Sequence, residues 1–170
     1  MQRINLLDLI ASLFSRDSSI IFTNFVDPLG NFEIYYPKNW NYDRDIAVSD
    51  GKYSISFEKN DNRFTVSVDI SLPRNFEFKK YAKHELEDPS SGIYSTMKKT
   101  RFKNMPAYRR EYSYVSGGKD YFGAGVIFFS GDSVFYLSWS APENEKDILE
   151  PVFQHMLEKL RLHRGLKIRK

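Results

Sequence analysis

Histidine side chains are the first candidates for metal or proton-transfer chemistry in this chain of 170 residues. The three histidines are His84, His155 and His163. Two ligands on one helix face stand three or four positions apart, whereas His155 and His163 stand eight apart. We therefore expect solvated helix histidines, with no metal site and no bound cofactor.

Carboxylates form two small clusters, which are the other candidate cation ligands. Asp43, Asp45 and Asp50 make the first cluster, and Glu58 and Asp61 make the second. Neither has the alternating oxygen ligands and the glycine of a calcium-binding loop. We interpret both clusters as solvated turn and edge positions.

Nucleophilic catalysis has little support in the sequence. The chain has no cysteine, which excludes thiolate nucleophiles, cysteine metal sites and disulfides. It also has no Gly-x-Ser-x-Gly string, the signature of one large class of serine hydrolases. We therefore expect no catalytic residue.

The glycine-rich string YVSGGKDYFGAG, residues 114–125, lacks the Gly-Lys-Ser/Thr ending of a phosphate-binding loop. Gly117 and Gly118 predict a hairpin turn. Gly123 and Gly125 then share a strand face, where a backbone or a helix can approach closely. These two glycines also leave a smooth patch beside aromatic residues, and they are the candidate groove.

The string AYRREYSY, residues 107–114, places Tyr108, Arg110, Tyr112 and Tyr114 on one strand face. Interleaved tyrosine and arginine are typical of protein interfaces. The same residue types can stack single-stranded nucleic acid, and a solvent-facing sheet with cross-strand aromatic pairs also has this pattern. The sequence favours a protein partner or self-association over nucleic acid.

Residues 4–16 predict an amphipathic helix whose apolar arc spans about 220°. So wide an arc suits burial against its own domain, against a partner or second copy, or on a membrane surface. Only Arg3 and Arg16 flank it with the positive charge that membrane binding favours. The candidate partner-binding residues on this helix are Leu6, Leu9, Ile10, Leu13 and Phe14.

Composition indicates a globular protein rich in strands. Hydrophobic residues make up 41% and aromatic residues 16% of the chain, and aromatic residues favour strands. The net charge of +3 comes from the end of the chain, because residues 161–170 hold five basic residues and no acid. A basic nucleic-acid-binding face across the whole domain is therefore not indicated. We expect an N-terminal helix at 1–17, one domain at 18–162 and a basic tail at 163–170.

The N-terminus does not predict a secretory signal, because Asp8 interrupts its apolar stretch and no small-residue cleavage site follows. No apolar run approaches the length of a transmembrane helix. We expect a cytoplasmic protein.

Residue patterns place the candidates on strands and helices. Strict period-two alternation over 52–59 and 63–72 predicts an antiparallel hairpin with one wet face. Spacings of three and four predict helices at 77–87 and 141–162. The second contains Pro151, so either residues 143–150 form a separate first turn or the helix kinks at the proline. Further strands are expected at 20–25, 32–36, 93–102, 107–115, 120–130 and 133–140.

Five aromatic residues crowd the stretch GNFEIYYPKNWNYD, residues 30–43. Phe32 and Tyr36 share a strand face with Ile34, so we expect core packing there. Pro37 ends the strand, and Trp40 is expected to fold back over the sheet end.

The order of these elements resembles the PsbP-like superfamily, which includes the photosystem II subunit PsbP and the Mog-type Ran-binding proteins. The resemblance covers about residues 25–162 and is carried by several strings in order: FEIYYPKNW, KYSISFEKNDNRFTVSVDI, FKKYAKHEL, MPAYRREYSY and VFYLSWSAPENEKDILEPVFQHMLEKLRL. It implies an α+β fold with a binding or assembly role rather than catalysis. No partner residue can be carried over, and the short N-terminal helix differs from the arm of the photosynthetic members.

We therefore expect an α+β fold, in which a mostly antiparallel sheet of about six or more strands is sandwiched by helices. The leading hypothesis for function is a non-catalytic protein-binding or assembly module. The alternatives are a small-ligand carrier or an unrecognised enzyme that uses the groove, and peripheral membrane association through the N-terminal helix.

Overall fold

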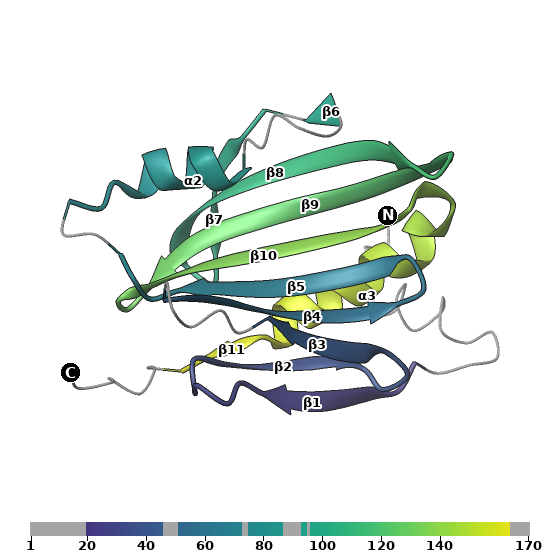
Figure 1. Ribbon diagram of the computed structural model, residues 1–170, viewed down its shortest axis with the longest axis horizontal. Coiled ribbons are helices and arrows are strands. Elements are labelled where there is room, and N and C mark those ends of the chain that lie inside the picture. The colour runs from purple at the N-terminus through teal and green to yellow at the C-terminus, as the bar shows by residue number, and fades with distance from the viewer. Residues whose placement is uncertain (1–19, 46–50, 73–74, 87–92, 95, 164–170) are drawn as a thin grey trace, which may run out of the picture. The chain divides into compact units, whose positions relative to one another are not determined.

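The computed structural model describes residues 20–45, 51–72, 75–86, 93–94 and 96–163 (Figure 1). The predicted helix at 4–16, with Leu6, Leu9, Ile10, Leu13 and Phe14, and most of the basic tail lie outside the described residues. The chain divides into two compact units, which are described separately.

The first unit contains the described residues of Met1–Trp40 and Glu150–Lys170. Its sheet has the order β1-β2-β11, formed by Phe22–Val26, Phe32–Pro37 and Arg161–Leu162. Helix α3, Lys146–Lys159, enters this unit with Pro151 inside the helix. Phe32, Ile34 and Tyr36 are buried, and Trp40 meets Phe153 of α3 edge-on at 6.1 Å between ring centroids. Phe32, Ile34 and Tyr36 are thus core, as predicted, whereas Tyr42 of the same stretch is 45% exposed.

The second unit, Asn41–Leu149, is built on an eight-stranded antiparallel sheet. The strand order is β3-β4-β5-β10-β9-β8-β6, and β7 also pairs with β8. Together with the helices, this sheet confirms the predicted α+β class with more than six strands. The strands are β3 Asn41–Asp45, β4 Lys52–Lys59, β5 Asn62–Asp69, β6 Ile93–Tyr94, β7 Lys98–Phe102, β8 Met105–Ser116, β9 Lys119–Ser130 and β10 Ser133–Pro142.

Tight turns set the register of the long hairpins. Gly117 and Gly118 join β8 to β9 with φ of 57° and 75°, which confirms the predicted turn. Lys103 and Asn104, with φ of 46° and 67°, join β7 to β8. The predicted strand 93–102 is therefore two short strands, and Pro106 lies inside β8 rather than in the turn. Pro106 precedes the first residue that pairs with β9, so its missing N–H removes no hydrogen bond on that side.

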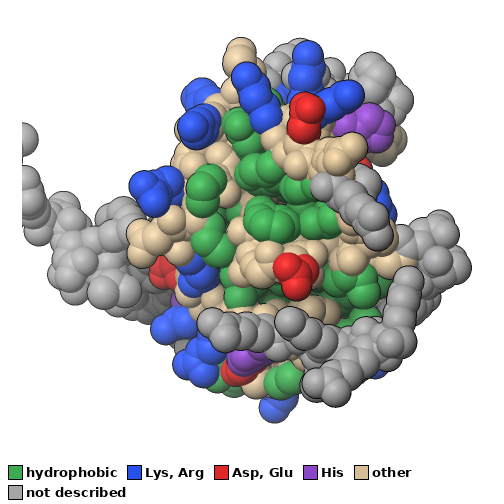
Figure 2. Space-filling view, turned by 90° about the vertical axis from the view of Figure 1, so that its left-hand side faces the viewer, with side chains coloured by type: hydrophobic (Ala, Val, Ile, Leu, Met, Phe, Trp, Pro, Cys, Tyr) green, Lys and Arg blue, Asp and Glu red, His purple; other side chains and the backbone are tan. Residues whose placement is uncertain are grey.

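Helix α2, Phe78–Leu86, packs on β8 and β9 (Figure 1). Ala82 and Leu86 are buried against Ile127 and Val134. A short 3-10 turn, Glu143–Glu145, precedes α3. The left-hand side of the molecule in Figure 1, toward which α2 extends, carries hydrophobic side chains in its middle and Lys and Arg side chains above them (Figure 2).

Candidate binding site

The pairing register divides the eight-stranded sheet into an apolar face and a hydroxyl-rich face, because directly paired residues point to the same side. The apolar face is buried and includes Ile55, Phe64 and Leu137. The other face, called the hydroxyl face below, also carries Gly123, Gly125, Arg63 and Arg110. Its hydroxyl side chains are Ser54, Ser56, Thr65, Ser67, Ser138, Ser140, Tyr108, Tyr112, Tyr114, Tyr121 and Tyr136.

Helix α2 covers one end of the hydroxyl face. The Phe78 ring lies 5.4 Å from the Tyr108 ring, and Arg110 Nη1 donates a 2.8 Å hydrogen bond to the Leu86 carbonyl. That bond satisfies a carbonyl at the helix end, which is otherwise left without a partner inside the helix. Two of the predicted partner-binding residues therefore also position α2.

Beside α2, the hydroxyl face has a groove of about 340 Å³. This volume lies within the range of small-ligand sites. One wall is α2, the floor comes from β4, β5 and β10, and the groove is open to solvent. The lining residues are Lys52, Tyr53, Ser54, Ser67, Val68, Asp69, Tyr81, Glu85, Val134 and Tyr136.

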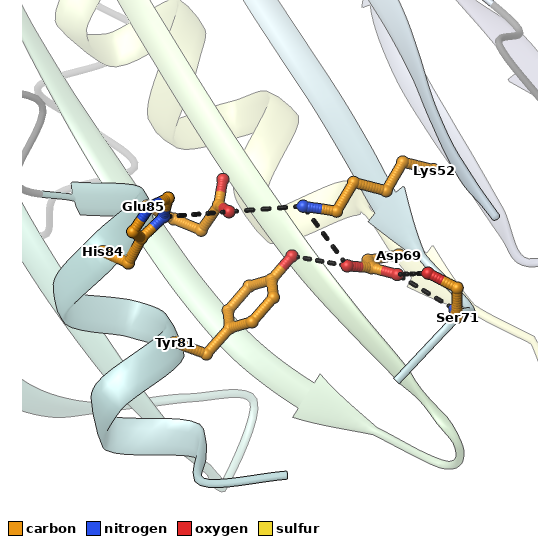
Figure 3. A network of polar contacts seen from close by, with 6 residues as sticks. All are labelled: Lys52, Asp69, Ser71, Tyr81, His84 and Glu85. Carbon is orange, nitrogen blue, oxygen red and sulfur yellow. Dashed lines mark hydrogen bonds and ion pairs between the residues drawn. The ribbon is translucent and has the colours of Figure 1, made fainter. Parts of the chain in front are cut away.

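A network of charged and hydroxyl groups spans the groove from α2 to the sheet (Figure 3). The Tyr81 hydroxyl donates to Asp69 Oδ2 at 2.6 Å, and the backbone N–H and hydroxyl of Ser71 donate to Asp69 Oδ1 at 2.9 and 2.8 Å. Lys52 Nζ lies 3.5 Å from Asp69 Oδ2 and 3.3 Å from Glu85 Oε1. The Asp69 side chain is 8% exposed, so these contacts replace most of its hydration.

The network fixes the charge state of its members. Burial favours the neutral form of Asp69, but the hydrogen bonds from Tyr81 and Ser71 and the charge of Lys52 outweigh it and lower the pKa of Asp69. Burial, together with the hydrogen bond to Asp69, raises the pKa of Tyr81 far above its usual value. Burial lowers the pKa of Lys52, but the Glu85 and Asp69 carboxylates raise it by more. The pKa of Lys52 is therefore higher than its usual value. At neutral pH, Asp69 and Lys52 are charged and Tyr81 is a neutral donor. These three residues therefore offer the groove fixed donors and acceptors.

Tyr112 and Tyr114 lie toward the other end of the same face. Tyr112 donates from its hydroxyl to the Trp139 carbonyl at 3.0 Å, so its ring lies across Gly123. The Tyr114 ring stacks on Tyr121, with 4.9 Å between centroids and 8° between planes. The structure thus places Tyr108, Arg110, Tyr112 and Tyr114 on one face, each of them half-buried.

The space above the candidate-groove glycines is occupied. A Cβ atom built on Gly123 would lie 2.4 Å from the Tyr112 ring, and one on Gly125 would lie 2.7 Å from the Tyr136 ring and 3.1 Å from Leu86. The predicted close approach therefore occurs, made by aromatic rings and by the end of α2. The hollow itself lies beside these glycines, next to Tyr136.

Lys52, Asp69, Glu85 and Tyr136 were not among the sequence candidates. Lys52 and Asp69 occupy positions that the strand pattern predicts to face solvent. A charged residue is ordinary at such a position and does not indicate a binding site. The amphipathic pattern predicted Tyr81 on the inner side of its helix, but which strands it faces depends on tertiary structure. In residues 20–163, apart from the ranges not described, no three His, Asp or Glu side chains group as metal ligands do.

Comparison with known proteins gives structural similarity only. No family model and no curated protein sequence matches the chain. Cyanobacterial PsbP from Synechocystis sp. PCC 6803 superposes with a TM-score of 0.61 at 11% identity, covering 88% of this chain and 96% of that one. The fold is PsbP-like.

Other solved structures share this PsbP-like fold. LpqN of Mycobacterium tuberculosis, which is involved in cell envelope biogenesis, has a TM-score of 0.53 at 17% identity, covering 94% of this chain and 97% of its own. A Pseudomonas aeruginosa protein described as a putative regulator has a TM-score of 0.53 at 14% identity, covering 85% and 99%. At such identities the similarity establishes the fold. In the part of the chain that the structure describes, no helix is long and apolar enough to cross a membrane.

Proposed function

We propose that the PsbP-like chain is a non-catalytic binding module that holds a protein partner on its hydroxyl face. The observation that carries this proposal is the composition of that face, which combines five tyrosines with six serines and threonines on adjacent strands. Tyrosine supplies large contact area with few rotatable bonds, and serine supplies adaptable hydrogen bonds. Antibody paratopes use the same combination to bind proteins.

Contacts within the face support binding with a small entropic cost. Tyr108 is held against Phe78, Tyr112 by the Trp139 carbonyl, and Tyr114 by Tyr121. Side chains that are already fixed lose little rotamer freedom when a partner covers them. We place the module in the cytoplasm, in keeping with its lack of cysteine.

Photo-crosslinking from two adjacent positions tests this proposal. Tyr114 and Val115 are neighbours on β8, but their side chains point to opposite faces of the sheet. A benzophenone amino acid at position 114 should crosslink a protein partner in cells, whereas one at position 115, where Val115 is 70% exposed, should not. Equal crosslinking from both positions, or crosslinking from 115 alone, would refute the proposed surface.

A second candidate function is the binding of a small polar ligand in the groove, and the groove's volume and converging polar groups favour it. Native mass spectrometry of the chain purified from its own cells would show a ligand as added mass. Ser54→Trp, which fills the groove floor, should remove that mass, and Ser113→Trp on the opposite face should keep it. An unchanged bare mass in the wild-type protein would argue against this candidate.

A further inference from the structure

An apolar patch surrounds the start of α2, at the end of the hydroxyl face that this helix covers. Phe76 is its centre, with ring centroids 5.7 Å from Phe129 and 6.3 Å from Phe78. Phe129 is 38% exposed, which is high for so large an apolar side chain. The patch, called the Phe76 patch below, consists of Leu72, Phe76, Phe78 and Phe129.

Basic side chains border the Phe76 patch on two elements. The β7 strand brings its positive charge close, because Lys99 pairs with Tyr108, whose ring contacts Phe78. Figure 2 shows Lys and Arg side chains gathered above the hydrophobic side chains on this side of the molecule. The exposed basic residues on this side are Lys79, Lys80 and Lys83 on α2, and Lys99 and Arg101 on β7.

The charge of this region is a local concentration. The segments 76–86 and 97–104 contain only Glu77 and Glu85 as acids. Apart from the last ten residues, the chain as a whole has more acidic than basic residues. The positive side chains are therefore gathered beside the exposed Phe129 and the half-buried Phe76 and Phe78, and a complementary surface must be negative and apolar at once.

We infer that the Phe76 patch docks on an anionic lipid surface, with the phenylalanines at the headgroup level and the lysines among the phosphates. Aromatic insertion beside lysine-rich charge is how peripheral proteins bind acidic membranes. The patch adjoins the hydroxyl face, because Phe129 pairs with Val134 and Phe78 packs on Tyr108, so lipid and a protein partner would occupy neighbouring parts of one side of the sheet.

Two features of the patch favour lipid over the other polyanions. Four of the five basic residues that border it are lysine, whereas protein interfaces and nucleic-acid sites favour the bidentate arginine. Base stacking also needs an open aromatic face. Here Phe76 is packed among Phe78, Tyr81 and Phe129, and Phe78 lies against Tyr108. Each of these rings already packs against others.

Vesicle co-sedimentation of the full chain tests the electrostatic part of this inference. Vesicles of phosphatidylcholine with about 30% phosphatidylglycerol should bind the protein, and pure phosphatidylcholine should bind it far less. Lys79→Gln, Lys80→Gln and Lys83→Gln together should weaken binding to the anionic vesicles by about tenfold or more.

The matched control removes the same charge at the opposite ends of the strands. Lys59→Gln, Lys119→Gln and Lys146→Gln together should change vesicle binding by less than about twofold. Equal losses in the two triple variants, or no loss in the first, would overturn the assignment to this patch. Binding of polyglutamate or single-stranded DNA at this patch, with no binding of anionic vesicles, would overturn the lipid itself.

Insertion of the phenylalanines has its own readout, because both native tryptophans, Trp40 and Trp139, are buried. Phe129→Trp should shift its fluorescence to the blue and be quenched by brominated lipid when anionic vesicles are added. Val115→Trp, near the far end of β8, should do neither. A Trp at position 129 that stays solvent-exposed while the protein sediments with vesicles would contradict docking through the Phe76 patch.

Discussion

The Tyr81 hydroxyl lies 2.6 Å from Asp69 Oδ2 and donates a hydrogen bond that ties helix α2 to strand β5. This bond joins the groove's α2 wall to its floor (Figure 3). It also joins two segments, each predicted from its own pattern, in a contact that neither pattern contains. The stability of the site should depend on it.

Removing this hydroxyl should destabilise the protein. Tyr81→Phe takes the donor from a buried carboxylate, and we expect the free energy of unfolding to fall by about 1–3 kcal/mol in urea denaturation. Tyr108→Phe is the control, because it removes another hydroxyl beneath α2 that is outside the Asp69 network. We expect it to cost under about 0.5 kcal/mol. An equal fall in the free energy of unfolding for the two variants would show that the Tyr81–Asp69 hydrogen bond does not stabilise the protein more than an ordinary hydroxyl does.

Acid should weaken the network through Asp69. Its folded-state pKa is depressed, so its contribution is present above the unfolded pKa of about 3.9 and is lost as the pH falls through the folded pKa. Urea denaturation should therefore find wild-type protein more stable than Asp69→Asn at pH 7, with the gap closing below about pH 4. Asp120→Asn, on an exposed carboxylate of β9, controls for the change of charge. A gap for Asp69→Asn that stays constant down to pH 2 would contradict this charge state.

The two strand glycines should differ in their tolerance of alanine. A Cβ on Gly123 would lie 2.5 Å from the Trp139 carbonyl oxygen, which is backbone and cannot easily move. A Cβ on Gly125 would meet only side chains, those of Tyr136 and Leu86. We expect Gly123→Ala to cost about 3 kcal/mol or more and Gly125→Ala about 1–2 kcal/mol, measured by urea denaturation. The reverse order would show that the ring packing over these glycines is not as described.

Local patterns were sufficient to predict most of the fold. Strict alternation along β4 and β5, and the glycine pair between β8 and β9, determined both hairpins before any tertiary contact was known. Strand β3 was missed because NYDRD is polar at nearly every position and does not alternate. The short pair β11–β2 was missed because two residues carry no pattern.

The candidate site was predicted in part. Parity along β8 correctly placed its tyrosines and Arg110 on one face, because alternation is a local property of a strand. The groove residues Lys52, Asp69 and Glu85 come together only through the order of the strands and the position at which α2 packs on the sheet. Both depend on contacts between residues far apart in the sequence, which no local pattern determines.

Affinity purification with two lysine variants tests the central claim that the hydroxyl face binds a protein. Ser138→Lys places a long charged side chain on that face beside Gly125 and Thr65, whereas Ser113→Lys makes the same change on the opposite face of β8. With both variants folded, as judged by thermal melting, the recovery of at least one partner should fall by about tenfold for Ser138→Lys and stay at the wild-type level for Ser113→Lys. Recovery of the same proteins in the same amounts with both variants would contradict the claim.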